Sequence, residues 1–97
     1  ETNFFLFIVE AIRYLPLVRD KVEAMVAQEI NTVKAILLCS ANRGEIRESL
    51  DLDFLAGHIV RAFDGYEMHG VLLGHSSKTH MEELIMVSQI WKLIKKA

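Results

Sequence analysis

The sequence predicts an all-α fold, an antiparallel bundle of about four helices that forms one domain over residues 1–97. Strand-like alternation of apolar and polar residues is nearly absent, whereas apolar residues recur at steps of three and four positions. The chain has one proline and five glycines, so helix breakers are few. Its 97 residues suffice for one small domain and no more.

The apolar content is high for a chain of this size. Counting glycine and omitting tyrosine, about 55% of the residues are apolar, against about 45–50% in an ordinary domain. A small helical chain has much surface for its volume, so the excess suggests a face buried against a second copy or another part of the protein. A well-filled core is the plainer alternative.

A first helix is predicted over residues 3–14 and a second over residues 16–42. The first carries apolar side chains on almost every side, so we expect it to be buried nearly all round. Pro16 suits the first turn of the second helix, where its missing N–H is not needed. At about 1.5 Å per residue the second helix is roughly 40 Å long, so it should form the spine of the domain.

The connection to a third helix over residues 52–73 combines a helix stop with a helix start. Gly44 can adopt the left-handed conformation that closes a helix without a Cβ clash. Asp51 can cap the third helix through its side-chain oxygen. Leu50 and Leu55 flank this cap at the spacing of a hydrophobic staple. The pattern predicts an antiparallel helical hairpin.

The third helix contains Gly57, Gly65 and Gly70. Each glycine costs up to ~1 kcal/mol relative to alanine in a helix interior, so a reason for them is needed. Close approach of another backbone is such a reason, and we expect it at Gly65. At Gly70 the sequence fits both close packing and a local break in the helix.

A fourth helix is predicted to follow a loop at residues 74–78. Thr79 and Glu82 match the capping-box pattern at its start. Its apolar residues point to more than one side, so we expect it to contact its own domain and a second surface. These residues are Met81, Leu84, Ile85, Val87, Ile90, Trp91, Leu93 and Ile94.

Charge, hydropathy and cysteine content exclude several classes of function. The net charge of −2 argues against nucleic-acid binding by this segment, and the lysines at 92, 95 and 96 form a solvated helix end. No apolar stretch is long enough to span a membrane, and because a basic start and a small-residue cleavage site are not found, we expect no signal peptide in these residues. The single cysteine, Cys39, lies in an apolar run, which predicts a buried thiol in a reducing, cytoplasmic setting.

No residue pattern indicates catalysis or metal binding. The four histidines, at 58, 69, 75 and 80, never fall three or four residues apart, so no two share a helical face as metal ligands. Ser76 and Ser77 lack the glycines of a nucleophile elbow, and a phosphate-binding glycine loop is absent. We therefore expect neither an enzyme nor a cofactor.

One segment carries a resemblance to a known family. It comprises Arg43-Gly44-Glu45-Ile46-Arg47, then Leu50-Asp51, Ala56, Ala62, Asp64 and Gly65. The segment resembles the passage into the penultimate helix in the C-terminal domain of the TetR family of bacterial transcriptional repressors. Pro16 after an apolar helix is similar to the start of the family's long central helix. The similarity is strongest from about residue 40 to 66 and looser elsewhere.

The resemblance implies a bacterial regulator that acts as a homodimer. Members contact DNA through an N-terminal helix-turn-helix domain, which these residues lack, so we expect the sequence to be a piece of a longer chain. Members dimerise through their last two helices, which form a four-helix bundle with the partner's pair. The interface residues expected here are Ile59, Gly65, Tyr66, His69, Leu73, Leu84, Ile85, Val87, Ser88 and Trp91.

The resemblance also implies a pocket for a small-molecule effector between the first three helices. The apolar walls would come from Phe4, Phe7, Ile8, Ile12, Met25 and Phe63. The polar groups would be Tyr14, Gln28, Asn31 and His58. An apolar lining suits a lipophilic or aromatic effector. A solid core built from the same side chains is the alternative.

The sequence is therefore interpreted as the effector-binding and dimerisation part of a transcriptional repressor. A small helical adaptor, which binds another protein and no ligand, is the alternative from a different class. A helical-bundle enzyme with a metal in its core is a third hypothesis. A cavity would favour the regulator, a solid core with a flat exposed patch the adaptor, and bound zinc or iron the enzyme.

Overall fold

The computed structural model describes residues 2–74 and 76–97, with side chains for residues 6–74 and 77–97. These residues form four helices, α1 (Thr2–Tyr14), α2 (Pro16–Asn42), α3 (Leu52–Leu73) and α4 (Ser76–Ile94). Consecutive helices contact one another in antiparallel fashion. The predicted all-α fold of four helices is confirmed.

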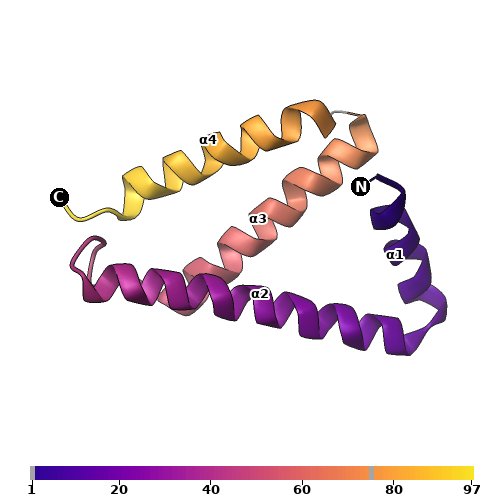
Figure 1. The fold of residues 1–97 in the computed structure, drawn as a ribbon, viewed down its shortest axis with the longest axis horizontal. Coiled ribbons are helices and arrows are strands. Elements are labelled where there is room, and N and C mark those ends of the chain that lie inside the picture. Colours follow the sequence, from indigo (N-terminus) through magenta and orange to yellow (C-terminus); the bar gives the residue numbers. More distant parts are fainter. Residues whose placement is uncertain (1, 75) are drawn as a thin grey trace.

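The four helices lie in one thin layer (Figure 1). The Cα atoms extend over 47 × 30 × 14 Å, and their radius of gyration is 15.6 Å, compared with about 12–13 Å for a compact domain of this length. α2, α3 and α4 follow one another as a zigzag, and α1 lies across the open side between the start of α2 and the end of α3. Because a single layer has two open faces, much apolar surface stays uncovered within the chain.

The core lies at one end of this layer, where the second half of α2 meets the start of α3 and the end of α4. Its centre is Ile46, whose side chain in the α2–α3 connection has 0% exposed surface. Leu37, Ala56 and Ile94 contribute the other buried side chains of this cluster. Half-buried residues surround them, among them both members of the predicted hydrophobic staple, Leu50 and Leu55.

A short backbone pairing closes the core from the outside. The N–H of Arg47 donates to the carbonyl oxygen of Ile94, and the N–H of Lys96 donates to the carbonyl oxygen of Glu45, each at 2.9 Å. These bonds flank an isolated antiparallel bridge between Ile46 and Lys95. The sequence predicts only a turn at residues 43–47. The structure shows instead that this turn binds the segment that follows α4.

The predicted helix ends are confirmed at three positions. Pro16 is the first residue of α2, and Leu15, with φ −127° and ψ 95°, is the single residue that separates α2 from α1. Gly44 follows α2 with φ +72°, in the left-handed region. Asp51 caps α3, where its Oδ1 accepts a hydrogen bond from the N–H of Phe54 at 3.0 Å.

Two burial predictions are wrong within this chain. α1 is not buried all round, since Phe7 is 66% exposed and Leu6 and Val9 are exposed as well. The physical reason is the single layer, in which α1 packs mainly against α2 and, less closely, against α3. Cys39 is exposed, because the apolar run before it winds round α2 and only Leu37 faces the core. No helix in the described part of the chain has the length and apolar character needed to cross a bilayer.

The structure differs from the sequence prediction at Gly65 and at the start of α4, and it decides between the two alternatives left open at Gly70. α3 continues unbroken through Gly70, which is buried, and ends at Gly74 in the left-handed conformation. Apart from the neighbouring backbone of α3 itself, no described atom lies within 4 Å of the point that a Cβ on Gly65 would occupy, so the described residues do not supply the expected close packing there. α4 already begins at Ser76, so Thr79 is a buried residue of its first turn and the predicted capping box is wrong.

Truncating Ile46 to alanine is expected to destabilise the fold by about 2–5 kcal/mol, because the side chain is completely buried and its removal leaves a cavity between three elements. Chemical denaturation followed by circular dichroism measures the loss. The matched control is Ile36→Ala on α2, where the side chain is 61% exposed and the change should be within about 0.5 kcal/mol. Equal losses in the two variants would contradict the central role of Ile46.

Candidate ligand cavity and hairpin surface

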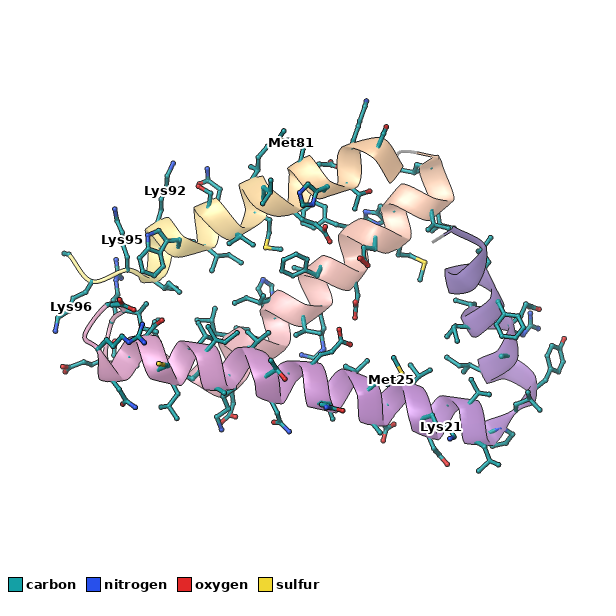
Figure 2. All side chains as sticks on the ribbon, in the orientation of Figure 1. Lys21, Met25, Met81, Lys92, Lys95 and Lys96 are labelled. Carbon is teal, nitrogen blue, oxygen red and sulfur yellow. The ribbon has the colours of Figure 1, made fainter. Side chains whose placement is uncertain are left out.

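The concave region of the chain lies among α1, α2 and α3, which form the sides of a triangle in Figure 1. A cavity of about 490 Å³ opens between α2 and α3, and a second of about 330 Å³ opens among all three helices. Met25, Glu29 and Asp64 line both cavities, so the two adjoin at these side chains. Figure 2 shows Met25 projecting from α2 into this space.

The helical repeat explains why these side chains face one space. Met25 and Glu29 lie one turn apart on α2, and Val60, Asp64 and Met68 follow one another at steps of four on α3, so each set shares a helical face. The larger cavity is also lined by Gln28, Thr32, Val33, Val60 and Phe63. The smaller one is also lined by Ile8, Val9, Ile12, Val22, Val26 and Met68.

Two carboxylates are the charged groups of this lining. Asp64 is half-buried, and burial raises its pKa above the ordinary aspartate value. Within the described part of the chain, neither Asp64 nor Glu29 forms an ion pair or a hydrogen bond. Thr32 is already bonded, because its hydroxyl donates to the carbonyl oxygen of Gln28 at 3.0 Å. The cavity therefore combines apolar walls with two carboxylates, of which Asp64 is half-buried and Glu29 is exposed.

The predicted ligand-binding residues are divided between the cavities and the surface. The cavity lining includes Ile8, Ile12, Met25, Gln28 and Phe63. Four other predicted residues are exposed and do not belong to the described lining of either cavity. They are Phe7, Tyr14, Asn31 and His58. The side chain of Phe4 lies outside the described residues.

The rings of two of these exposed residues contact neighbouring side chains outside the cavities. The ring of Tyr14 lies under the guanidinium carbon of Arg13 at 5.7 Å. The ring of His58 stacks on Phe54, with 5.9 Å between the ring centroids. Both side chains therefore have local roles on the surface of their own helices.

Sequence reasoning missed the two carboxylates of the cavity. A usable signal exists, because Glu29 follows Met25 by four residues and Asp64 follows Val60 by four, so each charge falls on the apolar face of its helix. A charged residue on such a face needs either a partner or a polar space. Asp64 is among the residues of the family resemblance, but the sequence did not indicate that it faces a cavity.

The hairpin of α3 and α4 carries a second candidate site. One side of α4, with Met86, Ile90 and Ile94, is turned toward the chain's own core. The opposite side is an exposed apolar row, here called the α4 outer stripe, which consists of Met81, Leu84, Ile85, Val87 and Trp91. In Figure 2, Met81 lies on the side of α4 that faces away from α3.

The predicted interface residues follow this division. Leu84, Ile85, Val87, Ser88 and Trp91 on α4 are exposed, as are His69 and Leu73 on α3. Three further predicted residues of α3, Ile59, Gly65 and Tyr66, are half-buried, and Ile59 packs against the chain's own core cluster. The exposed members thus form a surface along α4 and the end of α3.

Glu83 is a charged group on the inner side of this hairpin. Its Oε2 is buried and has no hydrogen-bond partner among the described residues. The pKa of Glu83 is raised, first by burial and then by the negative charge of Glu67, and His80 partly offsets this rise. The contact between α3 and α4 therefore disfavours the ionised form of the Glu83 carboxylate.

No family model, curated protein or solved structure matches this chain. The TetR assignment accordingly depends on the residues of the segment from about 40 to 66 and stays a prediction. Within the described residues, no group of three or more His, Cys, Asp or Glu side chains is placed to hold a metal ion.

Replacing Glu83 with glutamine is expected to stabilise the protein at neutral pH. Because the folded-state pKa of Glu83 is raised above its ordinary value of 4.5, ionisation costs more in the folded chain than in the unfolded one. Stability is therefore lost as the pH rises through the raised pKa. Thermal unfolding from about pH 3.5 to 7.5 should show a higher melting temperature for the variant than for the wild type, and this difference should disappear below about pH 4.

The matched control for this measurement is Glu82→Gln, since Glu82 is the exposed neighbour on the same helix. It should leave the pH dependence unchanged. If the difference in melting temperature between Glu83→Gln and wild type stays constant over the whole pH range, the charge of Glu83 is not the cause of that difference.

Proposed function

We propose that this chain is the effector-binding and dimerisation part of a TetR-type transcriptional repressor, without enzymatic activity. One observation carries the proposal: α3 belongs both to the cavity and to the exposed hairpin. Val60, Phe63 and Asp64 line the cavity, while His69 and Leu73 lie exposed toward the end of the same helix. A ligand in the cavity therefore contacts the helix that would also meet a partner subunit.

A homodimer follows from the exposed apolar surface. The α4 outer stripe presents a contiguous row of apolar side chains, of a kind that marks an interaction surface in soluble proteins. Two such hairpins can pack as an antiparallel four-helix bundle with crossing angles near 20°. Gly65, whose missing Cβ leaves open space, would allow a partner helix to approach α3 closely.

Regulation would then be a shift between two dimer arrangements. A ligand changes the balance only if it binds one arrangement better than the other. Filling the cavity pushes on α1, α2 and α3 together, so the spacing of the two subunits' helices is the property that a ligand can alter. DNA contacts would be made by a helix-turn-helix domain outside these 97 residues, since a chain of net charge −2 is poorly suited to bind phosphates.

The second candidate is an adaptor that binds a different protein and no ligand. The observation in its favour is the thin layer of helices, 14 Å in its shortest extent, with an apolar stripe along one edge. Such a stripe suits a foreign helix as well as a second copy. The cavity favours the regulator, because an adaptor has no use for an open space lined by two charges.

Trp91→Glu is expected to convert the dimer to monomers, because it places a charge within the proposed interface in each subunit. Loss of a tryptophan contact that anchors an interface costs about 2 kcal/mol or more, which weakens association by roughly 30-fold. Sedimentation velocity measures the change. The control Leu93→Glu adds the same charge to an exposed residue about 160° round α4 from Trp91 and should leave the dimer intact.

A dimer that persists in Trp91→Glu would remove the α4 outer stripe from the interface. Wild-type protein that sediments as a monomer would contradict the homodimer itself and leave the adaptor as the better account.

The coding region upstream of Glu1 gives an independent test. We expect it to encode a helix-turn-helix domain, because the family resemblance implies one before the ligand-binding helices. Sequencing the gene in its source settles this point. A gene that encodes another kind of domain there would contradict a TetR-type regulator.

A further inference from the structure

We propose that the contact between α3 and the first half of α4 is a pH-sensitive device, which tightens when the carboxyl group of Glu83 is protonated and loosens when it is ionised. The device lies within one chain and goes beyond the proposed function, since it needs neither a ligand nor a partner subunit. The pH thereby controls how firmly this half of α4 is held, and with it the position of the α4 outer stripe.

α4 is attached to the rest of the chain in two ways. Its end is fixed by packing and by backbone bonds, because Ile94 belongs to the core cluster and its carbonyl oxygen accepts from the N–H of Arg47 at 2.9 Å. Its first half packs mainly against α3, beside which it lies in Figure 1. The buried side chains of this half are Thr79 and Met86. A weaker contact with α3 therefore loosens the first half of α4 while its end stays fixed.

Glu83 lies in the middle of this contact. It follows Thr79 by four residues and precedes Met86 by three, so all three share the inner face of α4. Its Oε2 is covered and has no hydrogen-bond partner among the described residues, and none of their ion pairs involves it. A covered oxygen with negative charge and no partner costs free energy, whereas protonation removes the charge.

The charges around Glu83 also favour its protonated form. Burial is the first cause that raises its pKa, and the negative charge of Glu67 on α3 is the second. His80, three residues earlier on α4, partly offsets the rise. Asp64 of α3 lines the cavity beside α2. The charged residues of the α2–α3 connection lie at the other end of α4, roughly 16 Å along the helix from Glu83.

The direction of the pH effect follows from the raised pKa of Glu83. Because the closed contact holds the proton more tightly than an opened contact does, protonation stabilises the closed contact. This stabilisation is complete below the ordinary pKa of 4.5 and is lost as the pH rises through the raised pKa. Above the raised pKa the contact is at its weakest.

The same half of α4 carries part of the α4 outer stripe on its opposite side. Met81, Leu84 and Ile85 are exposed there, and Figure 2 shows Met81 turned away from α3. Side chains on both sides are fixed to one helical backbone, so a looser inner contact lets these three residues change position. Acidification holds them in the arrangement that the structure shows.

Hydrogen exchange of the wild-type chain, measured by mass spectrometry from about pH 4 to about pH 7.5, tests the inference. Protection factors report local opening without the intrinsic pH dependence of exchange. We expect the protection of amides 79–87 to fall at least about fivefold over this range, since each unit of pKa rise corresponds to about tenfold. The amides around Leu37, which is buried in the core cluster on α2, should keep their protection.

Four variants identify the group that responds. Glu83→Gln should abolish the fall, because its amide carries no charge at any of these pH values. The matched control Glu82→Gln, at the exposed neighbour, should show the wild-type fall. Glu67→Gln should move the midpoint of the fall to lower pH and His80→Asn should move it to higher pH, since they remove the repelling and the offsetting group. A merely structural role of Glu83 would not produce these opposite shifts.

Each part of the inference can be overturned. Constant protection of amides 79–87 in the wild type would show that the contact does not respond to pH. The same fall in Glu83→Gln would assign the response to another group, such as Asp64 on the other side of α3. An equal fall around Leu37 would show that the whole fold responds. If Glu83→Gln does not fold, the absence of opposite midpoint shifts in Glu67→Gln and His80→Asn overturns the inference instead.

Discussion

The side chain of Ile46 and the backbone pairing beside it are the contact on which the rest of the structure depends. They join the connection after α2 to the segment after α4, two stretches far apart in the sequence, and Leu37, Ala56 and Ile94 pack around them. The opposite end, where α1 lies, has no comparable cluster of buried side chains among the described residues. Stability and open space are thus separated along the long axis of the molecule.

The thin layer explains the apolar excess of the sequence. A helix in a closed bundle hides one broad face, whereas a helix in a single layer hides only the strips that touch its two neighbours. α1 and α4 each keep apolar side chains in water for this reason, Phe7 and Trp91 among them. The two helices differ in what could cover them. α4 presents a straight outer stripe, while α1 borders a cavity lined partly by charge.

The sequence predicts the helices better than their surroundings. Pro16, Gly44 and Asp51 act through dihedral angles and local hydrogen bonds, so the ends they mark are correct. The bridge at Ile46 joins residues distant in sequence and leaves no local pattern. Thr79 matches a capping motif, but α3 ends at Gly74 and α4 begins at Ser76, so Thr79 lies inside α4 and does not cap it. The sequence predicts a cavity among the first three helices but not that Glu29 and Asp64 line it. Whether a charged residue on the apolar face of a helix lines a cavity depends on the position of the facing helix, which local spacing does not give.

Leu15 is the single residue between α1 and α2, so the angle between these two helices depends on its two backbone dihedral angles. Its N–H donates to the carbonyl oxygen of Ala11 at 2.8 Å, and its carbonyl oxygen accepts from the N–H of Val18 at 2.9 Å. Leu15 is therefore hydrogen-bonded to both helices. Ile8, Val9 and Ile12 of α1 line the smaller cavity, so the angle at Leu15 also sets the width of that cavity. The cluster around Ile46 contains no residue of α1 among the described residues, so its packing does not depend on this angle.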